Sequence, residues 1–215
     1  MAIIVKSHIF ITFYAENKLV RMPWPKCDRV ESVCSVYRPR GLVYTDNLLY
    51  VACYGNPIGR VVVVGSEDMV VRRSFIAFRP RGIALWNHLI LVSEVNRGRV
   101  AAYKPSGRVV HVWGGFSEPR DISVNGDNMY VADTGNNRVV RVELPTSSYS
   151  DVLQTQRPNG VASNGTIVVS TDWNSGVVKI VNSNNDSYRC VNAHTPAMVS
   201  YARGNFIVCD VIGQC

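Results

Sequence analysis

The stretch Arg79-Pro80-Arg81-Gly82-Ile83 is followed, after a short polar break, by the apolar run Ile90-Leu91-Val92-Ser93-Glu94. The same arrangement recurs along the chain, and each copy begins at a proline, at positions 39, 80, 119, 158 and 196. Successive prolines are 38 to 41 residues apart. Self-similarity at such a period indicates an array of one repeated supersecondary unit.

Each repeat contains a pattern of four short strands. In the repeat that begins at Arg79, the predicted strands cover residues 82–85, 88–94, 98–104 and 108–113. Apolar and β-branched runs of this length, separated by Asn, Gly, Pro and Ser, are typical of an antiparallel meander. A four-stranded meander repeated about every 40 residues is the blade of a β-propeller. The sequence therefore predicts an all-β chain built from blades.

The repeats account for the whole chain, so we predict a single propeller domain over residues 1–215. The N-terminal residues provide a first blade, with strands predicted at 3–5, 9–14, 18–22 and 30–36. Four more blades begin at Arg38, Arg79, Glu118 and Arg157, and the last copy supplies only two strands, at 198–201 and 205–210. This count predicts six blade positions with the last blade truncated to two strands; five blades are the alternative. A partial blade has an open strand edge, where a partner or a C-terminal extension could add a strand.

The run from Met129 to Val139, Met-Tyr-Val-Ala-Asp-Thr-Gly-Asn-Asn-Arg-Val, closely resembles the core of an NHL repeat. Pro119-Arg120-Asp121-Ile122 fits the start of the same repeat, and Pro80-Arg81-Gly82-Ile83 with Asn96-Arg97-Gly98-Arg99-Val100 is a second good copy. The resemblance extends over the chain and is strongest in blades two to four. It implies a propeller of the NHL type. It leaves the function open, because such propellers include enzymes, RNA readers and protein scaffolds.

Composition points to a basic binding surface. The chain has a formal net charge of +7, and lysine occurs only at Lys6, Lys18, Lys26, Lys104 and Lys179, so arginine carries most of the 23 positive charges. The planar fork of arginine suits phosphate or carboxylate groups. A basic soluble surface without a specific ligand is the plain alternative.

The N-terminus lacks the basic start and unbroken apolar run of a signal peptide, because Lys6, Ser7 and His8 interrupt it. No apolar run approaches the length of a membrane span. We therefore expect a cytoplasmic protein, or one in a virion or other large assembly, with no membrane partner. The six cysteines are then expected as thiols. Their spacing lacks a C-x-x-C motif, so we expect neither a metal nor another cofactor.

The candidate binding residues surround the repeat prolines. Residues that follow or precede the prolines, together with loop residues after the second strands, are predicted to share one face: Arg40, Arg81, Arg120, Asn159, Arg38, Arg79, Arg157, Arg97, Tyr54 and Trp173. In the last copy Ala197 takes the place of the arginine. Cations with interleaved aromatics suit single-stranded RNA, which needs phosphate neutralisation and base stacking. Alternatively, the arginines pair internally with Asp133 or Glu94.

An enzymatic reading starts from Arg157-Pro158-Asn159-Gly160-Val161, which looks like the Pro-Asn-Gly segment of gluconolactonase-like propellers. The resemblance would make Asn159 a ligand of a divalent metal. Such a site needs several oxygen ligands, whereas the equivalent positions hold Arg40, Arg81 and Arg120. Arginines around a dication are electrostatically unfavourable, and we therefore expect no enzyme and no catalytic residues.

These observations favour a non-enzymatic binding or scaffold propeller that mediates protein–protein contacts in a larger assembly, such as a viral particle or ribonucleoprotein. The alternative is an RNA-binding propeller that uses the arginine-rich face. A lactonase-like, metal-dependent hydrolase is the third and least favoured reading.

Overall fold

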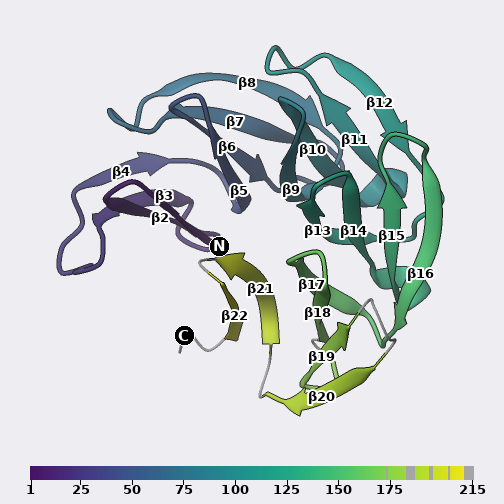
Figure 1. Ribbon diagram of the computed structural model, residues 1–215. Helices are drawn as coiled ribbons and strands as arrows, with labels where there is room; N and C mark the ends of the chain where they lie inside the picture. Colours follow the sequence, from purple (N-terminus) through teal and green to yellow (C-terminus); the bar gives the residue numbers. More distant parts are fainter. Residues whose placement is uncertain (173, 183–186, 194–195, 203, 211–215) are drawn as a thin grey trace. The chain divides into compact units, whose positions relative to one another are not determined.

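Six antiparallel sheets make up the described part of the computed structural model, which covers residues 1–172, 174–182, 187–193, 196–202 and 204–210 (Figure 1). The first sheet consists of β1 (Ala2–Val5), β2 (His8–Phe13), β3 (Lys18–Pro23) and β4 (Ser32–Ser35). The second consists of β5 (Pro39–Thr45), β6 (Leu48–Cys53), β7 (Gly59–Gly65) and β8 (Val71–Ala77). The third consists of β9 (Pro80–Trp86), β10 (Leu89–Glu94), β11 (Arg99–Tyr103) and β12 (Val109–Trp113).

The remaining sheets repeat this pattern. The fourth consists of β13 (Pro119–Asn125), β14 (Asn128–Asp133), β15 (Arg138–Glu143) and β16 (Ser148–Gln154). The fifth consists of β17 (Pro158–Ser163), β18 (Ile167–Asp172), β19 (Val177–Asn182) and β20 (Tyr188–Asn192). The sixth contains β21 (Pro196–Ala202) and β22 (Asn205–Asp210). Two short 3-10 helices, η1 (Val95–Arg97) and η2 (Thr134–Asn136), follow β10 and β14.

Each four-stranded sheet is a meander whose strands lie side by side in chain order (Figure 1). Five complete sheets and one two-stranded sheet confirm the predicted all-β propeller fold with a truncated last blade. That residues 1–215 form a single domain stays a prediction. No helix in the described ranges is long and apolar enough to cross a membrane.

The innermost strands begin at the repeat prolines themselves, two residues before the predicted start in the third sheet. Pro80 pairs with Glu94 across a register shift, and Pro39, Pro119, Pro158 and Pro196 pair in the same way with the last residue of the next strand. A bulge of this kind leaves an unpaired residue on one strand and bends it. The prediction relied on strict alternation of apolar residues, which begins only after the bulge. The predicted strand therefore starts too late.

The residue before each proline has a left-handed backbone. The φ angles are 45° at Arg38, 51° at Arg79, 47° at Glu118 and 46° at Arg157. Side-chain amides fix two of these residues in the same manner: Asn17 Oδ1 accepts the amide of Arg38 at 2.8 Å, and Asn137 Oδ1 accepts that of Arg157 at 3.0 Å. The four equivalent residues therefore leave the loop with one shared backbone geometry.

The glycine two residues after a repeat proline lies close to the neighbouring innermost strand in two repeats. A Cβ added at Gly41 of β5 would lie 2.7 Å from the carbonyl oxygen of Arg81 in β9. A Cβ at Gly160 of β17 would lie 3.0 Å from the Cα of Met198 in β21. The first distance is shorter than real Cβ contacts and the second is tighter than most of them, so glycine at these positions allows the strands to approach closely.

The chain divides into two compact units, Met1–Asn96 with Ala101–His111, and Arg97–Val100 with Val112–Cys215. The core of unit 1 lies between successive sheets; Tyr50, Val61 and Val63 of the second sheet pack against residues of the third, including Ala101 and Tyr103 of β11. In unit 2, Tyr130 and Val139 of the fourth sheet pack with Val161 and Val168 of the fifth. Alternating apolar residues on each strand supply these cores.

Candidate binding sites

The last residue of each second strand lies opposite the repeat proline, and its identity differs between repeats. It is Cys53 in β6, Glu94 in β10, Asp133 in β14 and Asp172 in β18. The three carboxylates accept backbone amides of nearby loops: Glu94 from Phe78 at 2.9 Å, Asp133 from Ser117 at 2.7 Å, and Asp172 from Asn174 and Ser175 at 3.1 and 3.2 Å. Cys53 offers no carboxylate, so the second sheet lacks the negative charge that the next three possess at this position.

Asp133 shows what the carboxylate does in unit 2. Its side chain is fully buried. It accepts hydrogen bonds from the amide of Ser117, from Asn136 Nδ2 at 2.9 Å and from Arg138 Nε at 2.9 Å. Arg138 also pairs with Asp151 at 2.9 Å, and the hydrogen bond to Asp133 raises its pKa above the ordinary arginine value. The internal pairing considered for Asp133 is therefore made by Arg138, not by an arginine beside a proline.

The predicted site residues of the fourth and fifth sheets have local partners. Arg120 donates from Nη1 to Asn159 Oδ1 at 3.1 Å and lies 3.9 Å from Glu118. Arg157 pairs with the same Glu118 at 2.9 Å. Asn159 is buried, and its amide also donates to the carbonyl of Ala197. Because its side-chain oxygen accepts from a cation, Asn159 is poorly placed to be a metal ligand.

The predicted site residues of the second sheet form a different arrangement, in which arginines lie against tyrosine rings. The Arg40 guanidinium lies 3.9 Å from the centre of the Tyr14 ring and 5.7 Å from that of Tyr54. Arg79 donates from Nε to the Tyr54 hydroxyl at 2.8 Å. Arg38 lies 5.9 Å from the Tyr14 ring. We call Tyr14, Arg38, Arg40, Tyr54 and Arg79 the arginine–tyrosine cluster.

The remaining predicted site residues, Arg81, Arg97 and Trp173, are not part of the arginine–tyrosine cluster. Arg81 lies half-buried in β9, and Arg97 ends η1 with an exposed side chain. Trp173 lies outside the described residues. Tyr14, which directly follows β2, was not predicted as a site residue, although it is the last residue of the predicted strand 9–14. The replacement of Glu or Asp by Cys53 was the signal in the sequence that set this repeat apart.

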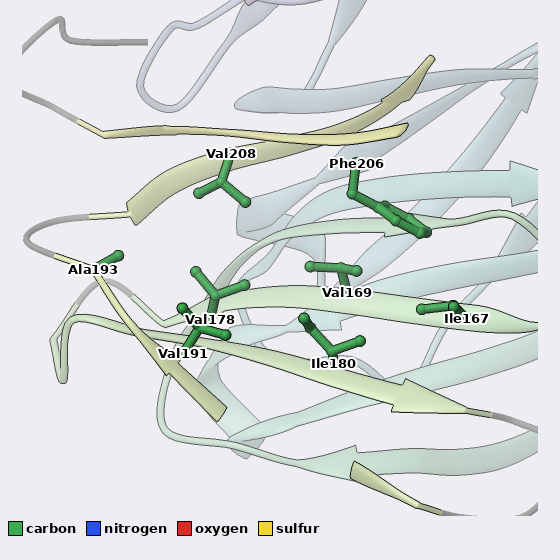
Figure 2. Close-up of a pocket in the computed structure, with 8 residues that line it drawn as sticks. All are labelled: Ile167, Val169, Val178, Ile180, Val191, Ala193, Phe206 and Val208. Carbon is green, nitrogen blue, oxygen red and sulfur yellow. The ribbon is translucent and has the colours of Figure 1, made fainter. Parts of the chain in front are cut away.

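A second candidate site is an apolar groove of about 480 Å³ in unit 2. It lies between the fifth sheet and β22, and its lining residues are Ile167, Val169, Val178, Ile180, Val191, Ala193, Phe206 and Val208. Figure 2 shows Phe206 and Val208 pointing from β22 toward Val169, Val178 and Ile180. In the described ranges, β22 has a neighbouring strand, β21, on one side only. The groove therefore adjoins a strand edge.

Unit 1 shows what fills the corresponding place. Ala101 and Tyr103 of β11, the third strand of the third sheet, pack against the face of the second sheet. Likewise Val64 of β7, the third strand of the second sheet, packs with Phe10 and Leu19 of the first. The two-stranded sixth sheet has no such strand in the described ranges. The groove is the space that a third strand occupies elsewhere in the chain.

No cluster of three or more His, Cys, Asp or Glu side chains with metal-site geometry occurs in the ranges that the structure describes. Burial raises the pKa of Cys53 to about 12, so this thiol is neutral and a weak ligand. Cys34 is also buried, and burial raises its pKa. These two cysteines serve as small apolar core residues.

Comparison with known proteins identifies one repeat and the fold. The NHL repeat family matches residues 116–142. No curated protein matches the sequence. A streptogramin B lyase structure is similar, with a TM-score of 0.76 and 13% identity, over 96% of this chain and 74% of that one. A chain of the nidogen/laminin complex has a TM-score of 0.80 and 16% identity, over 94% and 85%. Virginiamycin B lyase from Staphylococcus aureus has a TM-score of 0.75 and 11% identity, over 97% of this chain and 76% of that one.

These identities are low, so the solved structures establish the fold and leave the chemistry open. The matched repeat includes β13 and β14, where the sequence motif and the carboxylate network of Asp133 coincide. The other complete sheets repeat the same meander. The chain therefore has the β-propeller fold, and its fourth sheet matches the NHL repeat.

Proposed function

We propose that this protein is a non-enzymatic binding propeller that holds a protein partner in a larger assembly. The observation that carries the proposal is the apolar groove beside β22, whose eight lining residues are all apolar. The partner contributes an extended segment that pairs with the edge of β22 and covers the groove. Such strand addition combines main-chain hydrogen bonds with apolar pockets for alternate side chains.

The chemistry of the groove favours protein over nucleic acid. RNA recognition needs cations for phosphates and free aromatic faces for bases. The groove instead offers valine and isoleucine side chains, of which Val191 is 50% exposed. Burying apolar surface of this kind yields about 25 cal/mol per Å². One of the similar folds comes from a complex of two proteins, nidogen and laminin, which supports a protein as the class of partner.

The buried carboxylates support a non-enzymatic role. Glu94 accepts from the Phe78 amide and from the Tyr103 hydroxyl at 2.5 Å. Asp133 holds Ser117 and Arg138, and Asp172 holds the turn after β18. Each of these acids bonds to the backbone or to a neighbouring side chain. A catalytic acid would instead need to reach a substrate. The RNA-binding alternative rests on the arginines of unit 1, to which the next subsection returns.

A peptide that copies the chain's own third strand tests the proposal. We would label a peptide of residues 98–105, which includes Ala101 and Tyr103 of β11, and titrate it with the protein while following fluorescence anisotropy. We expect saturable binding with a dissociation constant of about 1–100 μM, the range of modest peptide interfaces. Replacing Ala101 by proline within the peptide should abolish binding, because proline removes a backbone donor.

The protein variants for this test are Val191→Asp and its matched control Val109→Asp. Both valines lie on the fourth strand of a sheet and are similarly exposed, at 50% and 43%, but only Val191 lines the groove. We expect Val191→Asp to weaken the peptide at least tenfold and Val109→Asp to leave it unchanged. Failure of the peptide to bind, or equal effects of the two variants, would overturn the groove as the binding site.

A further inference from the structure

The arginine–tyrosine cluster concentrates positive charge in unit 1. Three guanidinium groups, of Arg38, Arg40 and Arg79, surround two tyrosine rings whose centres are 6.2 Å apart. No described carboxylate lies within ion-pair distance of these three arginines. Like charges gathered around the same two rings repel one another, and the repulsion grows where water is partly excluded. No carboxylate of the described residues therefore neutralises the cluster.

The cluster also has hydrogen-bond donors in excess. Arg40 Nε is buried and has no hydrogen-bond partner in the structure. Arg79 uses two donors, to the Tyr54 hydroxyl at 2.8 Å and to Asn96 Oδ1 at 3.0 Å. The guanidinium of Arg38 lies over the rings of Tyr14 and Tyr37 and donates to none of the described residues. A buried donor without an acceptor costs about 1–3 kcal/mol, and the cluster has more donors than acceptors.

We propose that the arginine–tyrosine cluster binds the carboxylates of an acidic segment of a protein partner. The inference rests on the proposed protein-binding function, and it concerns residues separate from the apolar groove. The planar fork of arginine matches the two oxygens of a carboxylate. Stacking of Arg40 on Tyr14 orients its fork in advance, so less side-chain freedom is lost when the ligand binds.

The placement of the rings favours carboxylates over RNA. Bases bind single-strand readers by stacking on aromatic faces. Here Tyr14 has the Arg40 guanidinium 3.9 Å from its ring centre, and Tyr54 has Arg40 and Arg79 within 5.7 Å. The guanidinium groups thus lie against the ring faces on which bases would stack. The exposed Arg38 guanidinium keeps N–H groups that no described residue accepts, and such groups fit oxyanions.

A fluorescent hexaglutamate peptide is the probe for this site. Hexaglutamine provides the uncharged control, and hexauridylate provides RNA of similar length. At low salt we expect the full-length protein to bind hexaglutamate at least tenfold more tightly than either control, since several charge-assisted hydrogen bonds form only with the carboxylates. Binding should weaken as salt is raised, because the charges become screened.

Single variants then locate the site. Arg40→Gln and Arg38→Gln each remove one charge from the cluster, and Arg108→Gln removes one from an exposed residue of the same unit. We expect about a tenfold loss for Arg40→Gln, corresponding to the loss of charge-assisted hydrogen bonds, and less than about twofold for Arg108→Gln. Arg38 is exposed, so its variant tests the site even where Arg40→Gln disturbs folding.

Several outcomes would overturn the inference. Equal losses with Arg40→Gln and Arg108→Gln would indicate attraction to net charge alone. Tighter binding of hexauridylate, sensitive to Arg40→Gln, would make RNA the ligand. Val191→Asp should leave hexaglutamate binding intact, and Arg40→Gln should leave binding of the 98–105 peptide intact. Failure at the cluster is thereby distinguishable from failure of the proposed groove.

Discussion

Arg40 and Arg120 occupy the same position in their repeats, directly after the proline that starts an innermost strand, yet their surroundings differ. Arg120 in unit 2 donates to Asn159 and lies near Glu118. Arg40 in unit 1 lies against Tyr14 and has a buried Nε without a hydrogen-bond partner. One repeat motif thus produces a paired arginine in one unit and an arginine stacked on tyrosine in the other.

The contrast extends to the residue that ends each second strand. Asp133 faces Arg138 across the strand pair and bonds to it, whereas Cys53 faces Arg60 in the equivalent pair. Arg60 turns instead to Ser74 at 3.1 Å. Where the acid is present, the loop and the neighbouring arginine are tied down. In the second sheet, where the acid is absent, the facing arginine has a neutral hydroxyl as its partner.

The largest effect is expected from removing the acid. Asp133→Ala leaves the Ser117 amide and the Arg138 guanidinium without their buried acceptor, and breaking a buried pair in this way costs about 3–5 kcal/mol. Cys53→Ala, the matched change in the second sheet, removes only a sulfur and should cost less than about 2 kcal/mol. Urea unfolding followed by tryptophan fluorescence measures both. Equal losses would show that the two positions play the same part.

The next effect compares the two arginines. Arg120→Ala removes a hydrogen bond to the buried Asn159 and should lower the free energy of unfolding by about 1–2 kcal/mol. Arg40→Met keeps the packing on Tyr14 and removes one of three like charges, so it should be neutral or slightly stabilising. The same unfolding titration tests this. A larger loss for Arg40→Met than for Arg120→Ala would reverse the comparison.

Introducing the missing acid should create the missing pair. In Cys53→Asp the new carboxylate lies opposite Arg60, as Asp133 lies opposite Arg138. A double-mutant cycle with Arg60→Ala should give a coupling free energy of about 1 kcal/mol, within the range found for residues in contact. The same variant should weaken hexaglutamate binding, because it adds negative charge to the repeat. A coupling indistinguishable from zero would mean that the second sheet cannot accommodate the pair.

The smallest effect is expected from raising the pH, which should leave the charge of the Cys53 thiol unchanged. Burial raises the pKa of Cys53 to about 12, so its thiol keeps its proton in the folded protein and adds no negative charge between pH 7 and 9. The exposed Cys190 should be alkylated over that range while Cys53 is modified only after unfolding. Mass spectrometry of peptides after brief iodoacetamide treatment distinguishes them. Rapid modification of folded Cys53 at pH 9 would contradict the assignment.

The repeat prolines, the strand pattern and the truncated last sheet could all be predicted from the sequence, because period and alternation are local signals. The bulge that follows each proline was not predicted. It is a shift in the pairing between two strands, and the sequence of one strand does not show it. The sequence predicted that the arginines beside the prolines are site residues. It did not predict which groups they contact. Stacking of Arg40 on Tyr14 depends on a hairpin of the preceding sheet, 26 positions earlier in the chain. The groove beside β22 depends on side chains from four strands, which no linear motif joins.

The left-handed residues before the prolines have a consequence for protein engineering. A non-glycine residue in this conformation costs about 1–2 kcal/mol relative to a relaxed backbone, and Arg38, Arg79, Glu118 and Arg157 all adopt it. Glycine at such a site relaxes the backbone and removes the charge in one step. The four positions are thus places where surface charge can be removed blade by blade, with the expected backbone gain offsetting lost side-chain contacts.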